Sequence, residues 1–81
     1  MKEFIEYLLN QIVYKPEAVN VAEDQVGGVF QYKIAVDPSD MGLVIGKEGR
    51  TIRSLRALTR AKAIKDNVSI NLELTEDHAQ I

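Results

Sequence analysis

The sequence contains no cysteine, which excludes both a disulfide framework and a thiolate metal site. It also contains no uninterrupted apolar run near the roughly 18 residues that span a bilayer. Acids at Glu3 and Glu6 stand where a signal peptide has bare positive charge followed by an apolar stretch. These absences predict a cytoplasmic protein with no membrane partner.

The chain also lacks a large net charge, because its formal charge is only −2 at pH 7. The charge is nevertheless segregated along the chain. Residues 46–65 hold seven basic side chains and one acid, Glu48, for a charge of +6, so the remaining residues have a charge of −8. A local positive field of this kind suits a polyanion, although a solvated helix face has the same pattern. The basic residues are Lys47, Arg50, Arg53, Arg56, Arg60, Lys62 and Lys65.

The chain is short. Its 81 residues fall below the roughly 100 to 150 of a typical domain, so we expect a single domain over residues 1–81. Fractions of 46% hydrophobic and 27% charged residues are typical of a folded globular protein. A domain this small has a modest stability margin, which association with a second chain would raise.

Apolar residues at helical spacing predict a first helix near residues 2–14, ended by Lys15-Pro16, because proline disfavours helix at the residue before it. Two alternating stretches follow, at 19–22 and 30–36, and both read as half-buried strands. Gly27-Gly28 between them tolerates positive φ and predicts a tight antiparallel hairpin. The apolar positions of the helix are Phe4, Ile5, Leu8, Leu9, Ile12 and Val13.

Asp37-Pro38-Ser39-Asp40 predicts a helix start that leads into a short helix through about Ile45. A second helix is predicted from near Arg50. Arg53, Arg56 and Arg60 share one side of this helix. An apolar arc occupies another side and contains Ile52, Leu55, Leu58, Thr59 and Ala63.

After Asp66-Asn67 the clearest strand pattern occupies residues 68–75. The predicted order is helix-strand-strand-helix-helix-strand, an α+β fold in which the last strand runs parallel to the second. We expect a three-stranded mixed sheet with three helices packed on one face. The polar tail, residues 76–81, is expected to fray.

The loop between the last two helices, Gly46-Lys47-Glu48-Gly49, carries the chemistry. Its two glycines let a ligand approach the backbone closely. The helix beginning near Arg50 points unpaired N–H groups and the positive end of its dipole at the loop, which suits a phosphate. Lys47 and Arg50 would add cations, and Arg53 would extend the positive track by one turn.

Residues 43–52, LVIGKEGRTI, resemble the signature of the KH-domain family, aliphatic-Ile-Gly-x-x-Gly-x-x-Ile, without a gap. With its leading helix, the chain resembles the type II, bacterial-style arrangement over essentially its whole length, and is most similar to small single-domain bacterial KH proteins. The resemblance implies a groove for about four nucleotides of single-stranded RNA. Ile45 and Ile52 would flank this groove, with core packing as the equal alternative for both. The resemblance leaves RNA contact by Arg56 and Arg60 open.

The resemblance also implies a role as an RNA chaperone or post-transcriptional regulator that acts as a homodimer, or as a heterodimer with a larger KH protein. Apolar residues beside the loop, Thr51, Ile52 and Leu55, are a candidate two-fold contact. The alternative is a protein-interaction or dimerisation module with the KH fold and little RNA affinity. Glu48 departs from an all-cationic loop and predicts modest phosphate affinity.

Other chemistries fit poorly. In a nucleotide-binding P-loop, Gly42 would be one residue too close to Gly46, and Glu48 replaces the required hydroxyl. The single histidine, His78, lies in the tail, and no cysteine is available as a nucleophile. Asp37 and Asp40 are better explained by a helix start than by a metal site. We therefore expect no enzyme, no cofactor and no metal.

Overall fold

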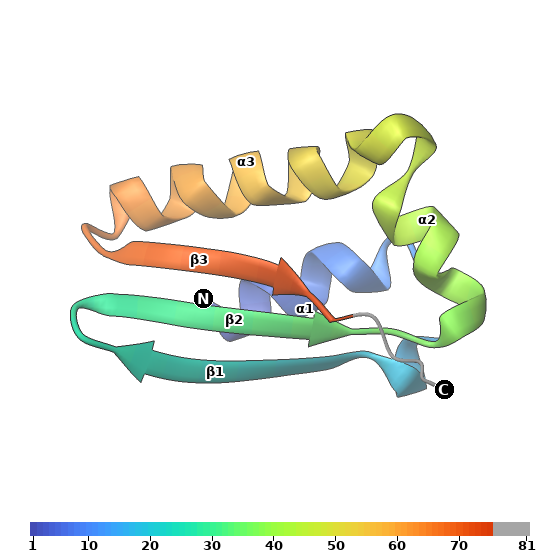
Figure 1. Cartoon of the computed structure of the whole chain (residues 1–81), viewed down its shortest axis with the longest axis horizontal. Coiled ribbons are helices and arrows are strands. Elements are labelled where there is room, and N and C mark those ends of the chain that lie inside the picture. Colours follow the sequence, from blue (N-terminus) through green and yellow to red (C-terminus); the bar gives the residue numbers. More distant parts are fainter. Residues whose placement is uncertain (76–81) are drawn as a thin grey trace.

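A computed structural model describes residues 1–75 (Figure 1). The predictions for the tail and for His78 lie outside these residues. The order of elements is the predicted one, with a short 3-10 turn before β1, α2 and α3. The bounds are α1 Lys2–Asn10, β1 Asn20–Val26, β2 Val29–Ala35, α2 Met41–Ile45, α3 Arg50–Lys65 and β3 Ser69–Leu74.

The sheet has the strand order β1-β2-β3, in which β1 pairs antiparallel and β3 parallel with β2. Val26 pairs with Val29, so Gly27 and Gly28 form a two-residue hairpin turn. Of these two glycines only Gly27 has a positive φ, +62°, as in type II′ turns. The predicted hairpin and the parallel pairing of the last strand are both confirmed.

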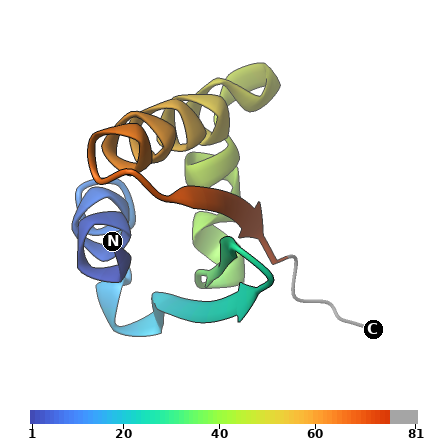
Figure 2. The ribbon, with the colours of Figure 1, turned by 90° about the vertical axis from the view of Figure 1, so that its left-hand side faces the viewer.

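The core lies between the sheet and the helices, which gather on one side of the sheet (Figure 2). Tyr32, Ile34 and Leu72 point to this side and are buried, whereas Lys33 and Glu73 alternate with them and are exposed. Ile5 and Leu9 of α1 are buried against the sheet. Each fully buried aliphatic side chain contributes about 1.5–3 kcal/mol, which makes this alternation the main determinant of register.

The first helix is shorter than predicted, because α1 ends at Asn10 rather than near residue 14. The N–H groups of Gln11 and Ile12 bond to carbonyls three residues back, which tightens the last turn. Val13 is still buried although it lies beyond the helix. The helical spacing of apolar residues therefore extends past the end of α1, because the non-helical segment that contains Val13 packs on the same core.

The apolar arc of α3 is narrower than predicted. Ile52, Leu55, Thr59 and Ala63 are buried, but Leu58 is 51% exposed, so the predicted apolar arc is only partly covered. Three residues at 3.6 per turn place Leu58 about 60° around the helix from Leu55. The sheet and α1 do not cover that flank.

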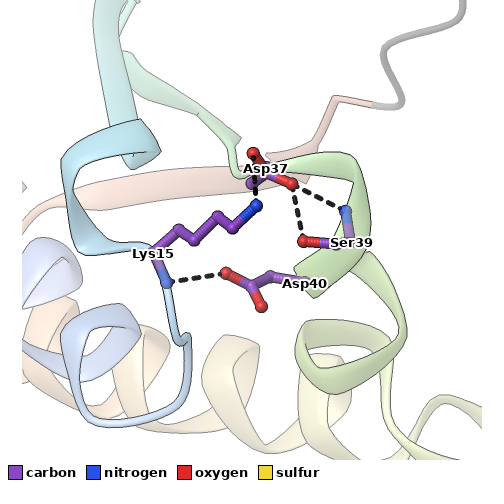
Figure 3. A network of polar contacts seen from close by, with 4 residues as sticks. All are labelled: Lys15, Asp37, Ser39 and Asp40. Atoms are coloured by element: carbon purple, nitrogen blue, oxygen red, sulfur yellow. Dashed lines mark hydrogen bonds and ion pairs between the residues drawn. The ribbon is translucent and has the colours of Figure 1, made fainter.

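A polar network connects the chain after α1 to the start of α2 (Figure 3). Asp37 accepts hydrogen bonds from the backbone N–H of Ser39 (2.9 Å) and from its Oγ (2.7 Å), as a helix-capping residue does. These bonds hold the pKa of Asp37 below its usual value, with a smaller contribution from the charge of Lys15. The buried carboxylate of Asp40 accepts the backbone N–H of Lys15 at 3.0 Å. The network thereby positions the helix that leads into the glycine loop.

Candidate nucleic-acid interface

Both glycines of the loop have positive φ, but only Gly46 has a conformation closed to other residues. Gly46 has φ +78° and ψ 172°, a conformation that residues with a Cβ essentially do not adopt. A Cβ on Gly46 would also lie 2.7 Å from the backbone nitrogen of Thr51. Gly49 is left-handed at φ +76°, and between the glycines Glu48 is left-handed too, at φ +55°. Gly46 therefore lets α3 fold back tightly against the end of α2.

Two of the four backbone N–H groups of the loop have no partner among the hydrogen bonds found in residues 1–75. The N–H of Gly49 bonds to the carbonyl of Gly46 at 3.1 Å, and that of Arg50 bonds to the carbonyl of Lys47. None of the backbone hydrogen bonds found in the loop uses the N–H of Lys47 or Glu48. Lys47 has the backbone conformation of a right-handed 3-10 turn, whereas Glu48 is left-handed. In such a pair of residues the successive N–H groups point to the same side and can bind an anion.

The basic side chains predicted for the site lie in the loop or in the first turns of α3. Lys47, Arg50 and Arg53 are all exposed. The side chain of Arg53 lies close to the loop: its Nη1 would be 3.3 Å from a methyl group on Gly49. Nη2 of Arg50 lies 3.9 Å from Oε1 of Glu48, so the loop's acid is paired with one of its cations. Arg50 and Arg53 thus lie against the loop at the N-terminus of α3, and Lys47 is part of the loop itself.

The two isoleucines of the motif differ in exposure. Ile45 is half-buried at the end of α2, whereas Ile52 is 8% exposed and belongs to the hydrophobic core. Leu55 is buried as well. Ile52 and Leu55 are therefore not available for the predicted two-fold contact, because their side chains belong to the core, whereas Thr51 is half-buried.

Arg56 and Arg60, which the sequence left undecided, lie on the flank of α3 that faces β3. Nε of Arg56 donates to the carbonyl of Leu72 at 3.3 Å. A small cavity of about 40 Å³ lies between the helix and the strand; its lining residues are Arg56, Arg60, Ile70, Asn71 and Leu72. Sequence reasoning missed Asn71, because no motif connects a polar strand residue to arginines on a preceding helix.

Two other findings concern residues 1–75. This part of the chain contains no group of three His, Asp or Glu side chains placed to hold a metal ion. None of its helices has the length and hydropathy needed to cross a membrane.

The α+β order with a parallel last strand, and a Gly-x-x-Gly loop between the last two helices, define the type II KH class. A family model described as KhpA/KhpB, KH domain matches residues 2–74. The chain belongs to this family.

Curated relatives support the same assignment. RNA-binding protein KhpA of Chlamydia trachomatis is 43% identical over 95% of this chain and 99% of its own length. The proteins of the same name from Clostridium perfringens and Thermotoga maritima are 39% and 49% identical, over 91% and 75% of this chain and 99% and 81% of their own lengths. These names describe binding and no reaction.

Proposed function

We propose that this chain binds single-stranded RNA, with a phosphate held by the backbone N–H groups of Lys47 and Glu48. The observation that carries the proposal is the loop geometry: two unpaired N–H groups in a left-handed turn at the N-terminus of a 16-residue helix. Lys47, Arg50 and Arg53 supply the surrounding positive charge. The names of the curated relatives support RNA as the polyanion.

The small cavity between α3 and β3 favours unpaired bases over a duplex. It has a volume of about 40 Å³, and Arg56 and Arg60 line it on the α3 side. Arg56 and Arg60 present planar guanidinium groups there, and unstacked bases pack on such planes. Phosphates at the loop and bases along α3 toward this cavity would account for a binding site of about four nucleotides.

We further propose that the chain is an RNA chaperone or post-transcriptional regulator and works as a dimer, either with itself or with a larger KH protein. A four-nucleotide site binds weakly and with little specificity. Two coupled sites on one RNA raise avidity by roughly 10²-fold or more when the RNA spans both. The family description, which joins KhpA and KhpB, supports a second KH protein as partner.

The test replaces both Lys47 and Glu48 with aspartate and measures affinity for a fluorescein-labelled single-stranded RNA by fluorescence anisotropy. The variant should bind at least tenfold more weakly at low salt, because two carboxylates would repel the phosphate from the loop. Lys2→Asp is the matched control, since it changes the net charge by the same two units at the exposed start of α1. Unchanged affinity of the double variant, with an unchanged circular dichroism spectrum, would refute the loop as the binding site.

A second candidate function is a protein-interaction module, and the outer side of α3 favours it. This side is exposed and carries no charge in its middle, where the residues are Ser54, Ala57, Leu58, Ala61 and Ile64. Small and apolar side chains allow two helices to approach closely. If the double aspartate variant and the wild type show equally weak RNA affinity, the interaction module becomes the better account.

A further inference from the structure

Glu48 is the one acid within the basic segment of residues 46–65, and it lies at the middle of the glycine loop. Its backbone has φ +55° and ψ 28°, which glycine adopts readily and glutamate does not. A strained residue at a binding loop calls for a functional explanation. The chain therefore carries a less suitable residue where its charge opposes the proposed ligand.

The only salt bridge of Glu48 in the described part of the chain is with Arg50. Oε1 of Glu48 lies 3.9 Å from Nη2 of Arg50, with 71% and 73% of the two side chains exposed. A pair this exposed adds little to stability. It does, however, place a carboxylate beside the cation that stands next to the unpaired N–H groups of Lys47 and Glu48.

We infer that the side chain of Glu48 limits RNA affinity by competing with the RNA phosphate for Arg50. The inference rests on the proposed function and concerns the same site. The backbone N–H of Glu48 helps to bind the phosphate, and its carboxylate opposes that binding. RNA must displace the carboxylate before Arg50 can engage a phosphate oxygen, so Glu48 makes binding weaker and more easily reversed.

The size of the effect follows from Coulomb's law. Freeing a cation from a unit charge about 4 Å away in a solvent-exposed site tightens its binding of a phosphate by roughly threefold to tenfold at low salt. Salt screens such an interaction within a Debye length of about 8–10 Å at 0.10–0.15 M ionic strength. The gain should therefore shrink as the salt concentration rises.

The experiment measures anisotropy of a fluorescein-labelled, 12-nucleotide single-stranded RNA of randomised sequence with Glu48→Gln, Arg50→Gln and the double variant. Glu48→Gln keeps the length of the side chain and removes only its charge. Asp24→Asn is the matched control: it makes the same charge change on β1, near the hairpin turn at the far end of the sheet from the loop (Figure 1). Urea unfolding of each variant reports whether Glu48 acts on stability instead.

Glu48→Gln should bind the RNA roughly threefold to tenfold more tightly at low salt, while Asp24→Asn binds like the wild type. In the Arg50→Gln background the same glutamate substitution should give a clearly smaller gain, because only the direct repulsion between the carboxylate and the phosphate remains. Equal affinity of Glu48→Gln and wild type, or an equal gain with and without Arg50, would overturn the inference. Both results leave the proposed function intact if the double aspartate variant at positions 47 and 48 still loses binding.

Discussion

At the scale of single residues, the two glycines of the loop have different structural tasks. Gly46 combines a backbone conformation closed to other residues with a close approach to Thr51. Gly49 has an ordinary left-handed conformation, and the nearest atom to an added methyl group belongs to the flexible end of Arg53. The two glycines of the Gly-x-x-Gly motif therefore differ in how strongly their backbone conformation excludes other residues.

We therefore predict that Gly46→Ala lowers the free energy of unfolding by about 2 kcal/mol or more, because strain and a backbone clash add. Gly49→Ala should lower it by about 1 kcal/mol, the usual penalty of a left-handed alanine. Urea unfolding followed by circular dichroism measures both values. The reverse order of the two variants would contradict the geometry described for Gly46.

At the scale of elements, the end of α3 shows how a local signal sets the next strand. Asn67 is left-handed at φ +62°. Its N–H bonds to the carbonyl of Ile64 (3.1 Å), and that of Val68 bonds to the carbonyl of Ala63 (2.9 Å), which is the Schellman pattern of a helix C-terminus. This turn reverses the chain, so that β3 can run back along α3 and pair parallel with β2.

Asn67→Ala should destabilise the protein by about 1 kcal/mol, because alanine adopts the left-handed conformation less readily than asparagine. Asn67→Gly is the comparison variant and should be at least as stable as the wild type. The midpoint of urea unfolding gives both differences. An alanine variant as stable as the glycine variant would show that the cap contributes little to α3.

The elements also show where sequence reasoning succeeded. The order of helices and strands, the hairpin, the parallel last strand and the capping role of Asp37 followed from spacing and turn residues. The end of α1 did not, since apolar spacing continued to Val13. Leu58 was placed on the apolar arc by its position on a helical wheel, whereas only the neighbours of a helix decide how much of that arc is buried.

At the scale of the whole molecule, charge and apolar surface occupy separate sides of α3. Arg56 and Arg60 face β3. The outer side, which includes Leu58 and Ile64, is exposed and uncharged at its centre. Since Ile52 and Leu55 are buried, this outer side is the apolar part of α3 that remains for a second copy.

Sedimentation should show that the wild type dimerises, with a mass twice its 9.1 kDa, and that Leu58→Asp shifts the equilibrium toward the monomer by tenfold or more. Val26→Asp is the matched control, because Val26 is similarly exposed (54%) and lies at the hairpin turn. A dimer that persists in Leu58→Asp would exclude the outer side of α3 as the interface.

The sequence by itself determined the α+β order, the KH class and the position of the loop, because these depend on local spacing, capping residues and a short contiguous motif. It also placed the basic segment beside the loop. Only the tertiary structure decided that Ile52 belongs to the core and Leu58 does not, and that Arg56 lies against the carbonyl of Leu72. It also decided that Glu48 is left-handed and paired with Arg50. Burial, contacts between distant segments and backbone conformation depend on how the elements pack, and no periodicity along one chain contains that information.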